Sequence, residues 1–519
     1  MKKPCKQCLR LIAVLAAVLC LCCSAYAQNG AIVQAAPVAK FSGSWYEIGR
    51  QIGLTYPESI VSFGLTMQTV LMFAGPGQGW TPQAFYAEIE GLLPQSIRDH
   101  LEGMAAGLAE ARYMSHETAW NIVVTQNVAT DLLNMDSMSS VPRPSARDFF
   151  GCTGFAVSSG AGTFLCHNTD APSTGGDDIN VLMYWQPDSG ENGFITMDPP
   201  GWADVAYAVN DRGIGVTMNA GNPNTDARIG LPVNCMIRTV MEHASSLEEA
   251  VGYFRTFLDQ GNSFSTGGAL VHLVDFNTSG MAKLQVRSRA LEVTYGEESP
   301  HGVTFIGSAN HFTGDFNPDP DYYYESSFER HERLMQLLGG TETFDLDACW
   351  SVLSDTLDGE GGSNCISRTG GSSGTAFGTV FTADGVYYTI GPPHEYLARY
   401  GTPQYVALDS AAAMNLATFT ASPESGAVTL SWTVDDESDI ASFDLYRAPS
   451  QTGPFEKITA SPVAVHDAGG GAYVYEDTGL QNRNRYFYRL EINGTGGAPA
   501  LQPCTVSATP RLIYAAAGR

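Results

Sequence analysis

The fold is decided by one stretch of the chain, residues 151–170, which reads GCTGFAVSSGAGTFLCHNTD. Two runs rich in β-branched and aromatic residues flank the turn sequence Ser-Gly-Ala-Gly, and this pattern predicts a β-hairpin. The four-residue turn sets the pairing along both strands, so that Cys152 faces Thr169 and lies next to Asp170. Directly opposed Cβ atoms lie roughly 5 Å apart. The hairpin therefore brings a thiol and a carboxylate together at one of its ends.

A thiol in this position can attack the carbonyl of the peptide bond that precedes it. Gly151 favours the attack because glycine accepts backbone angles that other residues resist. Hydrolysis of the resulting thioester frees the α-amino group of Cys152, whose reference pKa of about 7.7–8.0 suits a general base near neutral pH. That amine can activate its own thiol, with Asp170 orienting the pair. The alternative interpretation is a buried structural cysteine, with Asp170 as a turn residue.

The sequence Gly-Cys-Thr at 151–153, followed by Asn-x-Asp at 168–170, resembles the acyl-coenzyme A:6-aminopenicillanic acid acyltransferase family, also called the isopenicillin N acyltransferase-like family. Further motifs that resemble this family occur in order along the chain: Gly43-x-x-Tyr46-Glu47-Ile48-Gly49-x-x-x-Gly53, Glu102-Gly103-Met104-Ala105-Ala106-Gly107, Ser308-Ala309-Asn310-His311-Phe312 and Ser327-Phe328-Glu329-Arg330-His331-Glu332-Arg333-Leu334. The resemblance implies a four-layer αββα Ntn-hydrolase fold. It also implies self-cleavage between Gly151 and Cys152, with Cys152 as the nucleophile and Asp170 as a catalytic residue.

The resemblance implies roles for three more residues. Asn310 stands in the family's Asn-His-aromatic motif, whose asparagine donates an amide N–H to the oxyanion. Asn219 resembles a pocket asparagine of the related choloylglycine hydrolases. Arg368 lies in a region where family members can carry a site arginine, although Ser373 occupies the aligned position. The alternatives are turn residues for the two asparagines and a solvated loop arginine for Arg368.

The sequence predicts an α+β domain over residues 28–410, because strand and helix patterns alternate along it. Residues 28–40 are interpreted as a linker and residues 41–135 as mainly helical, with Met135–Asp148 as an exposed loop. The predicted helices are Ser96–Arg112, His116–Leu133 with Ser115 as its cap, Cys235–His243, Ser246–Leu258 and Ser327–Leu338. The predicted strands are Phe155–Ser158, Thr163–Cys166, Val181–Trp185, Phe194–Met197, Ala206–Asn210 and Gly215–Met218.

Residues 411–519 predict a second domain, a small all-β sandwich with about seven short strands. Trp432 stands on an early strand, and Tyr486 follows Leu480 by six residues. A buried early tryptophan and a corner tyrosine resemble the fibronectin type III class.

Residues 1–27 predict a signal peptide that is cleaved after Ala27. A basic segment with four Lys and Arg residues precedes the apolar run Leu11–Cys23, which is too short for a membrane span. The protein is therefore predicted to be secreted or periplasmic. The formal net charge of −26, or about −30 without the signal, argues against nucleic acid and anionic membranes as partners.

Six cysteines follow the predicted signal, and none stands in a paired Cys-x-x-Cys arrangement, so no zinc site is expected. Cys349 and Cys365 could form a disulfide. Residues 315–321 alternate Asp and Asn with the spacing of a calcium loop, but two prolines stiffen it and no bidentate glutamate follows at the expected distance. We expect no metal and no cofactor.

The sequence thus predicts an exported, self-processing enzyme that cleaves linear amide C–N bonds through an acyl-thioester at Cys152. The predicted substrate is a small N-acyl amide or a short peptide. One alternative is acyl transfer to an amine acceptor, since loops that cannot be placed from sequence shape the acceptor site. Another is a non-catalytic protein whose C-terminal sandwich binds a surface glycan or a protein.

Overall fold

The computed structural model describes residues 38–74, 80–112, 114–136, 151–172, 180–221, 229–265, 268–317, 325–357, 361–369, 373–401, 403–408, 416–434, 437, 440–449, 454–466, 471–494 and 500–510. The predicted signal peptide, the loop before Gly151 and most of the acidic segment 315–321 lie outside these ranges. So does the predicted domain boundary near residue 410.

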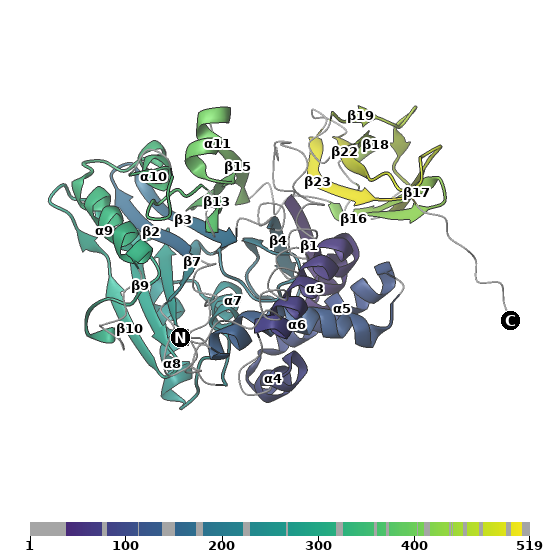
Figure 1. Cartoon of the computed structure of the whole chain (residues 1–519). Helices are drawn as coiled ribbons and strands as arrows, with labels where there is room; N and C mark the ends of the chain where they lie inside the picture. Colours follow the sequence, from purple (N-terminus) through teal and green to yellow (C-terminus); the bar gives the residue numbers. More distant parts are fainter. Residues whose placement is uncertain are drawn as a thin grey trace, which may run out of the picture.

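The first β-sheet has eight strands among the described residues, in the order β1-β4-β5-β6-β7-β8-β9-β10 (Figure 1). Its strands are β1 (Val38–Gly43), β4 (Val181–Pro187), β5 (Phe194–Asp198), β6 (Ala208–Asn210), β7 (Ile214–Ala220), β8 (Ala269–Asp275), β9 (Gly280–Arg287) and β10 (Ala290–Tyr295). Strand β1 pairs with β4 in parallel, whereas the other neighbours are antiparallel. The first strand of the chain therefore closes one edge of a sheet built mostly from residues after Cys152.

The second sheet has seven strands in the described part of the chain, in the order β11-β12-β2-β3-β13-β14-β15. Its strands are β11 (Glu297–Glu298), β12 (Thr304–Ser308), β2 (Gly151–Ser159), β3 (Gly162–Pro172), β13 (Ser373–Thr382), β14 (Gly385–Ile390) and β15 (Gln404–Ala407). Strands β2 and β3 form the predicted hairpin, and the predicted register is confirmed, because Cys152 pairs with Thr169 and Gly151 with Asp170.

Helices cover the outer face of each sheet. Over the first sheet lie α2 (Trp45–Thr55), α3 (Pro57–Ala74), α4 (Pro82–Ile89) with the 3₁₀ turn η2 (Glu90–Leu92), α5 (Gln95–Arg112), α6 (His116–Asp136), α7 (Val233–His243) and α8 (Leu247–Asp259). Over the second lie α9 (Glu325–Gly340), α10 (Leu346–Leu353) and α11 (Pro393–Tyr400), and a 3₁₀ turn η4 (Gly314–Phe316) follows β12.

A hydrophobic core lies at each of the three interfaces between these layers. One core joins α2–α8 to the first sheet. The second lies between the sheets and includes Leu165 from β3 and Ile195 from β5. The third joins α9 and α10 to the second sheet through residues such as Leu334 and Phe155. This succession of helices, sheet, sheet and helices confirms the predicted four-layer αββα arrangement.

Helices α2 and α5 pack with their backbones in contact, and glycines permit it. A Cβ atom on Gly103 would lie 1.9 Å from the carbonyl oxygen of Tyr46, and one on Gly107 would lie 2.1 Å from that of Arg50. On the facing helix, a Cβ atom on Gly49 would lie 2.1 Å from the oxygen of His100. The two glycine motifs near the start of the chain therefore interlock with each other.

The predicted helices and strands of the first domain all occur within one to a few residues of their expected bounds. Ser115 and Ser246 cap α6 and α8, accepting hydrogen bonds from the backbone N–H groups of Thr118 and Glu249. Strand β1 was missed, because residues 38–40 were interpreted as linker and the residues after them as helical. Its pairing partner, β4, lies about 140 residues away, and no local pattern reveals such a pairing.

The C-terminal segment forms a two-sheet β-sandwich, as predicted. One sheet has the order β16-β17-β21 and the other β19-β18-β22-β23, with β20 beside β18. The strands are β16 (Leu416–Glu424), β17 (Ala427–Val434), β18 (Ile440–Ala448), β19 (Glu456–Lys457), β20 (Val463–Ala464), β21 (Gly471–Thr478), β22 (Tyr486–Gly494) and β23 (Ala500–Ala508). Trp432 is fully buried between the sheets, and the hydroxyl of Tyr486 accepts the backbone N–H of Gln481, as expected of a corner tyrosine.

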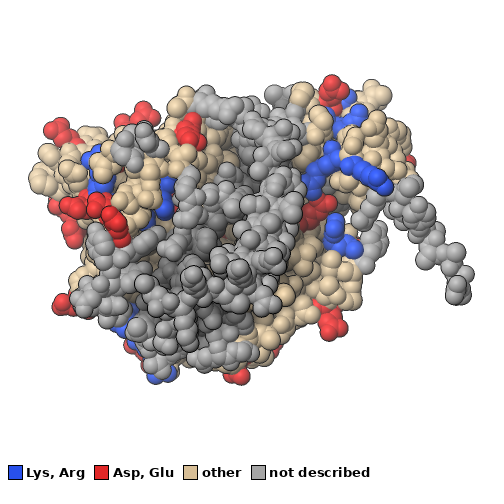
Figure 2. Space-filling model, viewed as in Figure 1, with Lys and Arg blue, Asp and Glu red and all other residues tan. Residues whose placement is uncertain are grey.

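The suggested disulfide between Cys349 and Cys365 is wrong. Cys349 is a free thiol on α10, and its hydrogen-bonding neighbour is Cys166 of β3. Among the described helices, none is long and apolar enough to cross a membrane. On the face of the molecule in Figure 2, acidic side chains are spread around the surface, interspersed with basic ones.

Candidate active site

The candidate nucleophile, Cys152, lies at the start of β2 and is 5% exposed. In the unprocessed chain, burial and the nearby Asp170 raise the pKa of its thiol to about 12. The backbone N–H groups of Asp170 and Ala220 and the guanidinium of Arg330 act in the opposite direction. The thiol is therefore protonated at neutral pH, and it needs a base before it can act as a nucleophile.

Gly151 is required for a reason other than the one expected from sequence. Its φ angle is not in the left-handed region. A Cβ atom there would instead lie 2.4 Å from Nη1 of Arg368 and 2.9 Å from Oδ2 of Asp170. The glycine therefore makes room for a buried ion pair directly beside the Gly151–Cys152 peptide bond.

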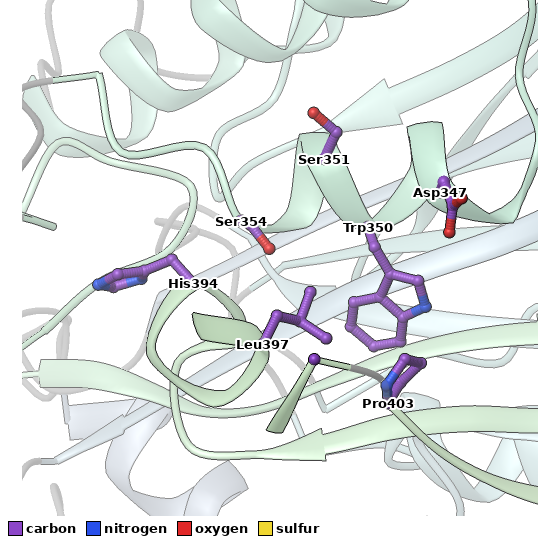
Figure 3. Close-up of a pocket in the computed structure, with 8 residues that line it drawn as sticks. Asp347, Trp350, Ser351, Ser354, His394, Leu397 and Pro403 are labelled. Carbon is purple, nitrogen blue, oxygen red and sulfur yellow. The ribbon is translucent and has the colours of Figure 1, made fainter. Parts of the chain in front are cut away.

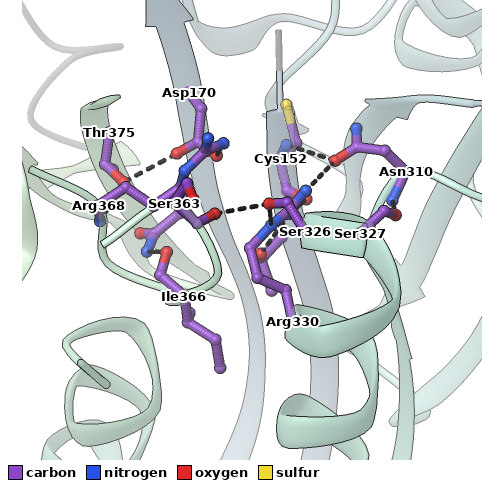
Figure 4. Close-up of polar contacts among 12 residues, drawn as sticks. Cys152, Asp170, Asn310, Ser326, Ser327, Arg330, Ser363, Ile366, Arg368 and Thr375 are labelled. Atoms are coloured by element: carbon purple, nitrogen blue, oxygen red, sulfur yellow. Dashed lines mark hydrogen bonds and ion pairs between the residues drawn. The ribbon is translucent and has the colours of Figure 1, made fainter. Parts of the chain in front are cut away.

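Asp170 is held on both oxygens. Nη1 of Arg368 donates to Oδ2 at 2.8 Å, and the hydroxyl of Thr375 donates to Oδ1 at 2.8 Å (Figure 4). Arg368 is only 3% exposed, so the alternative of a solvated loop arginine is wrong. The structure thus brings together two residues that are 198 positions apart in the sequence.

The asparagine of the Asn-x-Asp motif anchors the segment that carries Arg368. The side-chain amide of Asn168 donates to the carbonyl oxygens of Leu353 and Ile366, at 2.8 and 3.0 Å. The Asn-x-Asp motif therefore has two roles. Asp170 supplies the carboxylate, and Asn168 anchors the segment that carries Arg368, the partner of that carboxylate.

Asn310 follows β12 and faces the backbone nitrogen of Cys152. Its Oδ1 accepts the N–H of Cys152 at 2.8 Å and Nη2 of Arg330 at 2.7 Å. Its Nδ2 donates to the carbonyl oxygen of Ala220 at 2.8 Å. Two donors on Oδ1 fix the orientation of the amide, because a flipped amide would point N–H groups at N–H groups. The remaining hydrogen on Nδ2 is the one that an oxyanion could use.

Sequence reasoning missed Arg330 as a site residue, although it stands in the quoted Ser327–Leu334 motif. Arg330 lies on α9 and is fully buried. Its Nη1 donates to the carbonyl oxygen of Cys152 and, at 3.0 Å, to Oγ1 of Thr153 (Figure 4). One helical turn earlier, the hydroxyl of Ser327 accepts the backbone N–H of Asn310 at 2.7 Å. The start of α9 thus fastens both Cys152 and Asn310.

Asn219 lies within β7 and is fully buried, which excludes the turn-residue alternative. Its amide donates to the carbonyl oxygens of Ser308 and Ala309, and its Oδ1 receives Nε2 of His167 at 2.8 Å. Its hydrogen bonds are therefore directed at the backbone that leads into Asn310. Asn219 thus supports the segment Ser308–Ala309 that precedes Asn310.

Tyr207, between β5 and β6, is a second neighbour that sequence reasoning missed. Its hydroxyl contacts Cys152 and is hydrogen-bonded to Thr169, and its ring lies 4.6 Å from that of His167 between centroids. Burial raises the pKa of Tyr207 well above its usual value, so the phenol is neutral. No local signal marks a lone tyrosine in a loop as a site residue.

The histidines near this site are neutral at physiological pH. Burial lowers the pKa of His167 and of His311 to about 3. Within the described residues, no group of three or more His, Cys, Asp or Glu side chains is placed to hold a metal ion. In the part of the chain that the structure describes, Asp170, Arg368 and Arg330 are the charged groups close to Cys152.

A surface pocket of about 390 Å³ lies elsewhere, between α10 and α11 (Figure 3). Its lining includes Trp350, Leu397, His394 and Asp347. None of the candidate site residues lines this pocket.

Part of the chain matches the family that the sequence motifs resemble. Residues 157–384 match the family described as acyl-coenzyme A:6-aminopenicillanic acid acyl-transferase. The matched range contains Asp170, Asn219, Asn310 and Arg368, and it starts five residues after Cys152. No curated protein sequence matches the chain.

Two similar solved structures are named as a hydrolase and an acylase. A conjugated bile acid hydrolase from Clostridium perfringens, in mutant form, is 12% identical with a TM-score of 0.30, covering 50% of this chain and 93% of its own. A penicillin V acylase from Agrobacterium tumefaciens is also 12% identical, with a TM-score of 0.32, covering 50% of this chain and 86% of its own.

Proposed function

We propose that this protein is an exported, self-processing N-terminal-cysteine hydrolase that cleaves linear amide C–N bonds through an acyl-thioester at Cys152. The observation that carries the proposal is the geometry around the Gly151–Cys152 peptide bond. A buried thiol, the Asp170–Arg368 pair and the amide of Asn310 converge on this one bond. The match to an acyl-transferase family supports the same chemistry.

The first reaction is cleavage of the chain itself. Sγ of Cys152 attacks the carbonyl carbon of Gly151, and the C–N bond then breaks as the departing nitrogen takes up a proton. Water hydrolyses the resulting thioester and leaves a carboxylate on Gly151 and an amine on Cys152. Since Oδ1 of Asn310 already accepts the N–H of Cys152, the new amine is held where it forms.

The second reaction is turnover of a small N-acyl amide or a short peptide. The free amine takes the thiol proton, and the thiolate attacks the substrate carbonyl. The amide of Asn310 stabilises the oxyanion, a contribution of about 3–4 kcal/mol for such a donor. The leaving amine departs with a proton, and water releases the acyl group from the sulfur. Asp170, held by Arg368 and Thr375, orients the amine and thiol.

Acyl transfer is the second candidate, and the name of the matched family favours it. In that reaction an amine replaces water in the last step. Product analysis with and without an added amine distinguishes the two: an N-acylated amine as the main product supports transfer, and a free acid supports hydrolysis.

Intact-mass analysis and N-terminal sequencing test the proposal. The wild type is expected to yield a fragment that ends at Gly151 and a fragment that begins at Cys152. The variant Cys152→Ala is expected to remain uncut and to turn over N-acyl amides no faster than the background. Persistent wild-type enzyme with an intact 151–152 bond, or equal turnover by the variant, contradicts the proposal.

The same sequencing experiment tests export, because removal of residues 1–27 leaves an N-terminus at Gln28. A glycan or protein partner for the C-terminal sandwich stays a prediction from the sequence.

A further inference from the structure

The fully buried guanidinium of Arg330 shares one acceptor atom with the backbone nitrogen of Cys152. That acceptor is Oδ1 of Asn310, which lies 2.7 Å from Nη2 of Arg330 and 2.8 Å from the nitrogen of Cys152. Arg330 also donates to the carbonyl oxygen of Cys152, so it approaches this residue from two directions. A permanent positive charge therefore lies within about 6 Å of the nitrogen that processing turns into an amine.

We propose that Arg330 is a positioning residue that holds the amine of Cys152 in its neutral, proton-accepting form. This inference rests on the proposed function, since it concerns the amine that self-cleavage releases. The physical reason is that a nearby like charge disfavours protonation of an amine. The interaction is strong because Arg330 is fully buried and little screened by water.

The other charged and titratable groups around this nitrogen come from separate elements. Asp170 on β3 acts in the opposite direction, but its carboxylate is paired with Arg368 at 2.8 Å. Tyr207, between β5 and β6, is neutral, and so is His311, whose pKa is lowered to about 3. The thiol of Cys152 is itself the proton donor. Since Asp170 and Arg368 carry opposite charges that largely offset each other, Arg330 on α9 adds the net positive charge near the amine.

The same residue also acts on the sulfur. Its charge favours the thiolate over the thiol, as it lowers the pKa of Cys152 against the effect of burial. The cation therefore stabilises the thiolate, and it makes the amine a weaker base that stays unprotonated, and so able to accept the thiol proton, at lower pH. A free α-amine has a reference pKa of about 7.7–8.0, so Arg330 extends the useful range of this base to lower pH.

The test is the pH profile of kcat/KM for processed enzyme carrying Arg330→Met or Arg330→Lys. In Arg330→Met the acidic limb is expected to move about one to two pH units toward higher pH. Arg330→Lys keeps the positive charge but cannot donate to both the carbonyl oxygen of Cys152 and Oδ1 of Asn310 in the same way. For this variant the acidic limb of the pH profile is expected to stay near the wild-type position, while kcat falls. A Met variant that is folded and processed, with an unmoved limb, overturns the proposal.

Arg333→Met is the matched control. Arg333 lies one turn further along α9 and pairs with Asp355 at 2.8 Å, away from Cys152. The acidic limb of the pH profile of Arg333→Met is expected to coincide with that of the wild type. A shift in Arg333→Met as large as the shift in Arg330→Met also overturns the proposal.

Loss of Arg330 can block self-cleavage. A site for a sequence-specific protease placed directly before Cys152 then releases the same amine, and the profile is measured on that material. If the wild-type protein is never cleaved between Gly151 and Cys152, the proposed function is refuted. If the wild type is cleaved but the acidic limb of Arg330→Met lies at the wild-type pH, only the role of Arg330 is refuted.

Discussion

Asp198, at the end of β5, is a fully buried carboxyl group that accepts several hydrogen bonds. The hydroxyl of Thr196 contacts both Oδ2 of Asp198 and the carbonyl oxygen of Tyr207. The hydroxyl of Thr196 and the backbone N–H of Ala206 both donate to Oδ2 of Asp198. These donors favour the ionised carboxylate, but the effect of burial on its pKa is larger. Burial accordingly raises its pKa to about 7.

This raised pKa predicts a loss of stability as the pH increases. Below about pH 4, Asp198 is protonated in the folded and in the unfolded chain and contributes no pH dependence. Between about pH 4 and 7 the unfolded chain releases the proton that the folded chain retains, so the free energy of unfolding falls, by on the order of 4 kcal/mol in total.

The variant Asp198→Asn removes this titration and keeps the shape of the side chain. The free energy of unfolding in urea is measured for both proteins. The difference between Asp198→Asn and the wild type is expected to increase in favour of the variant from pH 4 to pH 7 and then to stay constant. The same substitution at the exposed Asp188 is the control. A difference between Asp198→Asn and wild type that does not change with pH refutes a protonated Asp198.

The site residues differ in how far the sequence reveals them. Cys152 and Asp170 could be placed together because they belong to one hairpin, whose short turn fixes the register. Asn310 was found only through its motif. Arg330 and Tyr207 were missed as site residues, since they reach Cys152 from segments whose position depends on the packing of whole layers. Arg368 was identified only as a weak candidate for the same reason.

At the scale of elements, local patterns predicted most helices and strands, and long-range pairing decided the remainder. The glycine motifs of α2 and α5 were recognised as a resemblance, but their physical purpose is contact between the two helix backbones. Strand β1 has no such local signature, since its stability comes from β4 and from the core beneath.

The glycine contact predicts a large effect for Gly103→Ala. The new methyl group would lie 1.9 Å from the carbonyl oxygen of Tyr46, so α2 and α5 must separate. We expect the free energy of unfolding to fall by about 2–3 kcal/mol, even though alanine favours helix formation. Gly252→Ala in α8 is the control, because its methyl group meets nothing within 4 Å and should stabilise the helix by about 0.5–1 kcal/mol. Equal effects of the two substitutions in chemical denaturation contradict the close contact.

At the scale of the whole molecule, one hydrophobic core contains residues from both sides of the proposed cleavage site. Residues upstream of Gly151, including Ile48, Met104 and Val123, share this core with Trp185 and Leu273 from downstream strands. Strand β1 also contacts β16 and β23 of the C-terminal sandwich, and Glu58 of α3 pairs with Arg485. The upstream segment is therefore held by a sheet edge, a shared core and the second domain.

The shared core predicts that the two fragments remain together after cleavage. Under native conditions, size-exclusion chromatography should give one peak at the position of the uncut Cys152→Ala variant, with both fragments visible on a denaturing gel. Separation of the fragments without denaturant contradicts this prediction.

The interlocked glycine helices both precede residue 151, and this has a consequence for how the protein can be produced. The contact between α2 and α5 does not cross the 151–152 bond, so we expect that two co-expressed genes can supply the two parts as separate polypeptides. After removal of the initiator methionine, the downstream part of such a split version begins with the free amine of Cys152. It would allow the substrate reaction to be studied in variants that are unable to mature on their own.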